Sequence, residues 1–225
     1  MRSLKFAKVD FMRNRRQVRL TLLLVAIALY FGHSDKATGY LAGLLYLVFM
    51  VNVFCNVIFV NTGMQGTGFV LLLPGSVRHR ICGRFLYGAV FLSATVVVYW
   101  IAALLTGIGH ILSKQGIFLC LMALFIGIMV NNIEFVLFYL FGESKSQMTM
   151  SLLRILPPLC CFFIGFSIIN NLESMVGASE MLLNILLWIE SHLALCTAIL
   201  FGLTIIITCV CILLSTAISE RRDFA

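Results

Sequence analysis

Charged residues are scarce in this chain, at 11% of its 225 residues, and there are only 3 prolines. Hydrophobic residues make up 61%, which is more apolar surface than the core of a water-soluble domain of this length can bury. A separate soluble domain is therefore excluded, and lipid is the expected surrounding. A Gly-Lys dipeptide is also absent, which rules out a phosphate-binding loop of the form G-x-x-x-x-G-K-[ST].

The motifs of membrane-embedded enzymes are missing as well. There is no Glu-Glu pair for a glutamate-type metal protease, and the nearest approach to an intramembrane serine protease motif, Gly177-Ala-Ser179, falls in a loop. The histidines and the 8 cysteines lack the spacing of a metal site or a disulfide framework. We therefore expect no catalytic site, no metal and no other cofactor in this chain. The net charge of +7 has no folded basic domain to present it, so no nucleic-acid partner is expected.

What the chain does contain is a series of apolar runs separated by short polar segments. A bilayer core of about 30 Å needs roughly 20 helical residues per crossing. The predicted fold class is all-α, a polytopic membrane protein with six transmembrane helices in a single domain, 1–225. The predicted spans are 18–32, 38–60, 85–108, 116–141, 152–169 and 193–218. The basic start followed by an apolar run resembles a secretory signal, but its removal would leave five spans with an inverted charge pattern, so an uncleaved first span is simpler.

The distribution of basic residues predicts the orientation of these spans. Cytoplasmic loops near spans hold an excess of Lys and Arg. With the N-terminus inside, only Lys36 and Lys114 of the 16 Lys and Arg residues lie in external segments. The external segment 170–191 carries glutamates and no base. Both termini are therefore predicted to be cytoplasmic.

Two connecting segments have features beyond those of a simple loop. The external segment 170–191 contains an apolar stretch that ends at Trp188 and is too short to span, so we interpret it as lying in or dipping into the outer leaflet. The alternative is that this stretch only extends the sixth helix. The cytoplasmic segment 63–84 begins with several glycines and then reads Leu73-Pro74-Gly75-Ser76 before a basic helix, for which Ser76 is a candidate N-cap.

This cytoplasmic segment resembles the loop between spans two and three in the membrane subunits of ATP-binding-cassette (ABC) exporters of the type 2 permease family. The family loop reads roughly Leu-Pro-x-Ser/Thr-Arg/Lys, followed by a basic and an aromatic residue that begin span three. Here Leu73-Pro74-Gly75-Ser76 precedes Arg78, one place later than the family pattern, and Arg84-Phe85 follows. The family also has an N-terminal interfacial amphipathic helix and a re-entrant external element, to which 1–17 and 170–191 correspond.

The resemblance implies a transport subunit that depends on other chains. Two permease copies, identical or paired with a related subunit, enclose the pathway. Each docks its loop on a separate ABC ATPase subunit, which binds ATP and Mg²⁺ and moves the spans when it closes. The residues of this coupling loop are Leu73, Pro74, Ser76, Val77, Arg78, His79, Arg80, Ile81 and Arg84. Basic side chains would pair with carboxylates of the ATPase and apolar ones would pack against it. The alternative is that the arginines only fix the topology or bind anionic lipid.

Several polar residues fall inside predicted spans. Glu134 is costly at that depth, so it should face other helices or water, and Arg84 or Arg154 could pair with it. The amides beside it in sequence and in span two are candidates for lining a pathway or for hydrogen bonds between helices: Asn52, Asn56, Asn131 and Asn132. The sequence leaves a structural and a transport role open for these residues.

The leading hypothesis is an ABC transporter permease in the cell membrane, and the expected membrane is the plasma membrane of a bacterium. Its few charges and many Phe, Leu and Met residues suit export of a hydrophobic or amphipathic substrate such as a peptide, a lipid-like molecule or a drug. The alternative is a membrane channel or scaffold subunit that is not driven by ATP.

Overall fold

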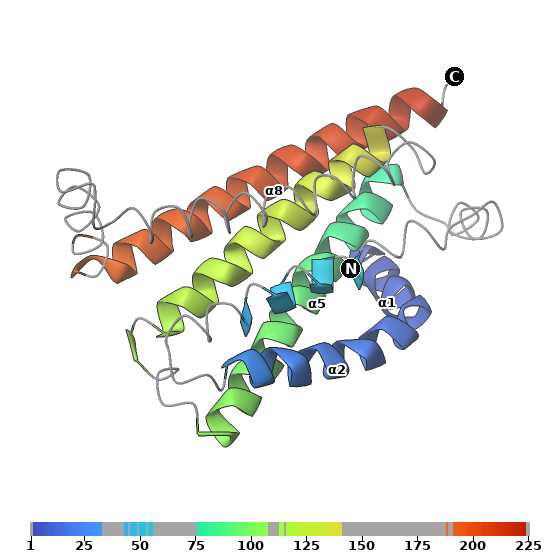
Figure 1. Cartoon of the computed structure of the whole chain (residues 1–225). Helices are drawn as coiled ribbons and strands as arrows, with labels where there is room; N and C mark the ends of the chain where they lie inside the picture. The colour runs from blue at the N-terminus through green and yellow to red at the C-terminus, as the bar shows by residue number, and fades with distance from the viewer. Residues whose placement is uncertain are drawn as a thin grey trace, which may run out of the picture.

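The computed structural model describes residues 2–32, 43–44, 46–48, 50–52, 54–55, 76–107, 113–114, 116–140, 188 and 191–223. Nearly all of these residues are helical and no strand occurs among them, so the all-α prediction is confirmed for this part of the chain (Figure 1). The helices are α1 (Arg2–Arg13), α2 (Arg15–Gly32), α5 (Val77–Leu105), an unlabelled helix (Gly116–Leu140) and α8 (Leu193–Asp223). Three of them, α5, Gly116–Leu140 and α8, are long and apolar enough to cross a membrane.

Other predicted elements are described only in part. The described residues between 43 and 55 are helical and lie inside the predicted second span; they are called the 43–55 segment below. The predicted fifth span, 152–169, and residues 63–75 of the coupling loop lie outside the described residues, as does most of the external segment 170–191. At the end of that segment, the carbonyl of Trp188 accepts a hydrogen bond from the backbone N–H of His192, immediately before α8.

Contacts along α5 and the Gly116–Leu140 helix show that these two helices run antiparallel. Near the start of α5, Arg84 donates a hydrogen bond to the hydroxyl of Tyr139, near the end of the other helix. Further along α5, Leu92 lies against Gly127, which comes earlier in the Gly116–Leu140 helix. Antiparallel packing is expected for neighbouring helices joined by a short connection.

By the same reasoning, α8 runs parallel to the Gly116–Leu140 helix (Figure 1). The rings of Phe125 and Phe201 have centroids 5.7 Å apart. Further along both helices, Asn132 donates a hydrogen bond to Thr208. Parallel neighbours need a connection that returns the chain to the first side, and the predicted fifth span would supply it.

The helix α2 and the 43–55 segment form an antiparallel pair. At one end, Asn14 donates a long hydrogen bond, 3.4 Å, to the carbonyl of Phe54. At the other end, a Cβ placed on Gly43 would come 2.5 Å from the carbonyl oxygen of Ala28. Glycine is therefore required at position 43 for the two backbones to approach this closely.

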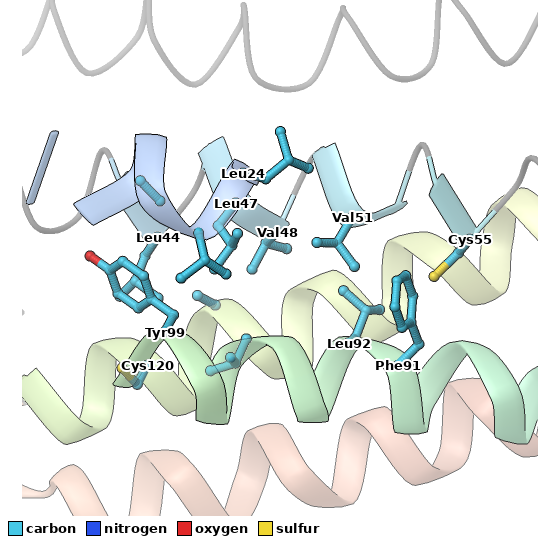
Figure 2. Close-up of a cluster of buried hydrophobic side chains, with 14 of the residues drawn as sticks. Leu24, Leu44, Leu47, Val48, Val51, Cys55, Phe91, Leu92, Tyr99 and Cys120 are labelled. Carbon is cyan, nitrogen blue, oxygen red and sulfur yellow. The ribbon is translucent and has the colours of Figure 1, made fainter. Parts of the chain in front are cut away.

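The main core lies between α2, the 43–55 segment, α5 and the Gly116–Leu140 helix (Figure 2). Its labelled side chains are Leu24, Leu44, Leu47, Val48, Val51, Cys55, Phe91, Leu92, Tyr99 and Cys120. A second cluster of buried side chains joins the start of α5 to α8 through Ile81, Phe85, Phe135 and Cys211. Of the three helices that could cross a membrane, α8 is the least buried, and its exposed side chains are mainly apolar.

Candidate functional site

The described part of the coupling loop forms the first two turns of α5. Ser76 occupies the N-cap position with extended backbone angles, φ −66° and ψ 152°, as the sequence predicted. Its hydroxyl makes no bond to the helix backbone and instead contacts Nδ1 of His79. The basic helix and the third span are one continuous helix of 29 residues, because no break separates Val77 from Leu105.

The length of α5 places its start outside the hydrocarbon region. At a rise of 1.5 Å per residue the helix is about 43 Å long, which exceeds the roughly 30 Å of a bilayer core. Its first turns carry three arginines, which avoid hydrocarbon, so the excess length belongs at this end. A displacement of these turns would be transmitted directly into the span, since the helix is uninterrupted.

The side chains of these turns divide between the surface and the interior. Ser76 and Arg78 are exposed, and His79 and Arg80 are half-buried. Ile81 is only 2% exposed and packs inside the chain. Val77 packs against the same cluster. Leu73 and Pro74 lie outside the described residues.

Arg84 also faces inward. Its guanidinium donates a hydrogen bond of 3.3 Å to the hydroxyl of Tyr139 and lies 6.0 Å from the centre of that ring. The carboxylate of Asp10 is close enough for its charge to act on both side chains. Arg84 therefore links α5 to the Gly116–Leu140 helix while remaining half-buried.

The helix α1 packs closely on the start of α5. A Cβ placed on Gly83 would come 2.6 Å from the Cβ of Phe6 and 2.8 Å from the carbonyl oxygen of Ser3. The absence of a side chain at Gly83 is what allows this contact. Sequence reasoning did not single out this position, because a lone glycine in a helix has several explanations.

Two buried polar residues add to the attachment of α1. Asp10 is 4% exposed, and Asn14, at the turn before α2, donates a hydrogen bond of 2.9 Å to the hydroxyl of Tyr87 on α5. Phe6 and Asp10 lie on one face of α1, and Asn14 continues their spacing of four residues just after the helix ends. That spacing was the signal available in the sequence for this contact.

The opposite face of α1 explains why its apolar residues do not form one stripe. Leu4, Phe11 and Met12 are exposed, whereas Phe6 is buried against α5. The apolar side chains thus serve two surfaces, one toward α5 and one toward the surroundings. Exposed apolar side chains beside the exposed Lys5 and Lys8 are typical of a helix lying on a membrane surface, which remains the prediction for segment 1–17.

Deeper in the bundle lies a layer of buried polar groups. Asn52 donates a hydrogen bond of 3.3 Å to the carbonyl of Gly127, and Asn132 donates one of 2.8 Å to the hydroxyl of Thr208. Both bonds join different helices. Glu134 and Asn131 are also buried, and Glu134 lies near enough to the neutral thiol of Cys55 to act on it electrostatically. Asn56 and Arg154 lie outside the described residues.

A comparison with protein-family models matches residues 8–221 to the family described as ABC-2 family transporter protein. The chain belongs to this family. The match begins within α1 and ends within α8, so it includes the start of α5 and the buried polar layer. A comparison with curated proteins found no match.

Membership in the ABC-2 family establishes this chain as an ABC transporter permease embedded in a membrane. Such permeases are transport components that associate with an ABC ATPase subunit and are generally not catalytic themselves. Among the residues that the structure describes, no three His, Cys, Asp or Glu side chains gather as a metal site. The coupling loop stays a prediction, and Ser76 and Arg78 are its exposed residues within the described part.

The hydrogen bond between Asn132 and Thr208 is expected to contribute to stability in this ABC-2 permease. Asn132→Leu and Thr208→Val should each lower the free energy of unfolding by about 1 kcal/mol or less, because hydrogen bonds between membrane helices are of that size. The double variant should lose little more free energy of unfolding than either single variant. Thermal unfolding of the purified proteins in one detergent tests this, and fully additive losses would contradict a direct interaction.

Proposed function

We propose that this permease exports a hydrophobic or amphipathic substrate, such as a peptide, a lipid-like molecule or a drug, and that ATP hydrolysis on a separate subunit drives the export. ATP and Mg²⁺ would bind to that ATPase subunit and not to this chain. The observation that carries the proposal is the exposed pair Ser76 and Arg78 at the tip of α5. Because α5 is one unbroken helix that is long enough to span a bilayer, movement at its tip would move the span.

The packing of α5 supports this route of transmission. Phe85 meets Phe135 edge to face with ring centroids 5.3 Å apart, and Ile81 packs in the same cluster as Cys211 of α8. Arg84 adds its contact with Tyr139. A shift of the first turns of α5 would therefore act on both the Gly116–Leu140 helix and α8, since interiors packed in this way transmit displacement.

The directions of the described helices support six spans with both termini in the cytoplasm. From α2 onward, each described helix runs opposite to the one before it, apart from α8, which runs parallel to the Gly116–Leu140 helix. A single further crossing within residues 141–192 would account for that exception. The basic residues would then face the cytoplasm, in the plasma membrane of a bacterium.

A second permease copy, identical or related, is the proposed partner within the membrane. The exposed side chains of α8 include Leu195, Ile199, Phe201, Ile206, Val210 and Leu213. Apolar side chains on this scale suit contact with lipid or with another membrane helix. The few charged groups in the described spans suit a pathway for apolar cargo, which is the basis of the substrate class.

The experiment that tests the proposal is co-purification with a co-expressed ABC ATPase. Ser76→Asp with Arg78→Glu should lower the amount of bound ATPase about tenfold or more, since reversing charges at a docking surface costs about 1.4 kcal/mol or more. Aspartate is a good N-cap and a negative charge near a helix N-terminus is stabilising, so these changes leave α5 intact.

The matched control is Lys114→Glu, an exposed residue just before the Gly116–Leu140 helix, at the predicted external side. It reverses one positive charge, as Arg78→Glu does, and should leave ATPase binding unchanged. Equal loss in both variants would point to a general effect of charge. If the unaltered protein binds no ABC ATPase, the proposal is overturned, and a channel or scaffold subunit becomes the better explanation.

A further inference from the structure

The buried polar layer contains more hydrogen-bonding atoms than the described residues satisfy. Asn131 is 0% exposed, and neither atom of its side-chain amide has a partner among the residues that the structure describes. Asn52 and Asn132 each donate one hydrogen bond, but their Oδ1 atoms lack a partner within the same described ranges. Three neighbouring amides thus leave polar atoms unused inside one copy of the chain.

The contacts place these atoms at one level of the bundle. Asn52 bonds to the carbonyl of Gly127, which lies one turn before Asn131 on the same face of its helix. From the other side, α5 brings Gly88 against the amide of Asn131. Asn131 is therefore enclosed by the 43–55 segment and by α5.

The neighbours of this enclosure are one carboxyl group and one thiol. Glu134 lies about one turn beyond Asn131, and Cys55 about one turn beyond Asn52. Cys55 is 0% exposed, and its neutral thiol lies near enough to Glu134 for the carboxyl to act on it electrostatically. Both groups therefore line the same stretch of the interface between the 43–55 segment and the Gly116–Leu140 helix.

An unpaired amide in an apolar interior costs several kcal/mol, and buried polar groups in folded proteins almost always have a partner. The unused atoms here comprise amide oxygens and an amide nitrogen, so the partner must both donate and accept. Water does both, and a buried water typically makes about three hydrogen bonds. An anion is disfavoured, because it would be repelled by the amide oxygens and by the carboxyl of Glu134.

We propose that each copy of this permease binds ordered water inside the membrane at Asn52, Asn131 and Asn132, next to Glu134. This hydrated site lies within a single copy and is separate from any pathway between copies. It gives the buried carboxyl of Glu134 a polar surrounding within the bilayer. The assignment does not depend on ATP-driven export, because it rests only on the packing of the helices.

Radiolytic hydroxyl-radical footprinting of the full chain in lipid nanodiscs tests the site. Radicals form from water where it is bound and oxidise the nearest sulfur, so Cys55 should be oxidised several-fold faster than its exposure allows. The comparison within the same protein is Cys120, which is 6% exposed and packs in the main core. Equal rates for the two cysteines, or a slower rate at Cys55, would overturn the proposal.

A variant then identifies the residues that hold the water. Asn131→Leu should reduce oxidation of Cys55 to the level of Cys120 and leave Cys120 unchanged. Continued fast oxidation of Cys55 in a folded Asn131→Leu protein would contradict the site as assigned. The same measurement is made in buffers that contain either Na⁺ or choline as the cation. If oxidation of Cys55 in the unaltered protein were suppressed in Na⁺, a cation would be bound by these oxygens and the assignment to water would be wrong. The comparison of the two cysteines needs no variant, so it stands even if Asn131→Leu fails to fold.

Discussion

Replacing Gly83 with leucine is expected to release α1 from α5 and to lower the free energy of unfolding by about 1–3 kcal/mol, the range for overpacking a close contact. The added side chain would start 2.6 Å from the Cβ of Phe6, 2.8 Å from the carbonyl of Ser3 and 3.3 Å from the backbone nitrogen of Ala7. Backbone atoms cannot rotate away from a new neighbour, so α1 as a whole must shift.

Thermal unfolding in one detergent, followed with a thiol-reactive dye, measures this effect because Cys55, Cys120 and Cys211 are buried and become reactive on unfolding. Limited trypsin digestion should in addition cleave the variant faster at the exposed Lys5 and Lys8. If transmission through α5 depends on α1, ATPase activity coupled to this permease should fall in the same variant.

Gly202→Leu is the matched control for this change. It makes the same substitution within a long helix, α8, but nothing lies within 4 Å of a Cβ placed there. Its expected effect is neutral or slightly stabilising, since leucine favours a helix over glycine by under about 1 kcal/mol. Equal melting temperatures for the two variants would show that α1 does not pack against Gly83 as described.

The second large effect is expected from Arg84→Leu, which should lower the free energy of unfolding by about 3 kcal/mol. The substitution removes the hydrogen bond to Tyr139 and the positive charge near the buried carboxylate of Asp10. Asp10 is buried, so the loss of a positive charge near its carboxylate adds to the expected destabilisation.

A double-mutant cycle separates these contributions. Adding Asp10→Asn to Arg84→Leu should recover 1 kcal/mol or more, at the order of magnitude known for close buried pairs. Arg78→Leu is the control on the same helix, because Arg78 is exposed, and it should change stability by less than about 0.5 kcal/mol. Strictly additive effects of the changes at positions 10 and 84 would contradict an interaction between the two charges.

Much of the architecture was predictable because the bilayer imposes strong constraints on composition. The predicted spans 116–141 and 193–218 agree closely with Gly116–Leu140 and the apolar part of α8. The third span was predicted to begin at residue 85, whereas α5 begins at Val77. The difference arises because arginines mark the end of the apolar run but do not end a helix, for which they have a high propensity.

The roles of individual polar residues were much less predictable. The motif around Ser76 singled out the first turns of α5, but it did not reveal that Ile81 packs inside the chain or that Arg84 bonds to Tyr139. Both face inward because the start of α5 is packed against the Gly116–Leu140 helix and α8, which lie far away in the sequence. Helical periodicity alone does not tell which neighbour a face will meet.

By itself, the sequence determined that this chain is helical and apolar enough for lipid, and where three of its spans lie. Only the tertiary structure decided that Asn14 bonds to Tyr87, that Gly83 admits α1 and that Asn131 is enclosed. The physical reason is the separation along the chain over which each effect acts. Hydropathy and charge act on each segment separately, through its transfer between water and lipid, whereas these contacts arise only when helices distant in the chain are brought side by side.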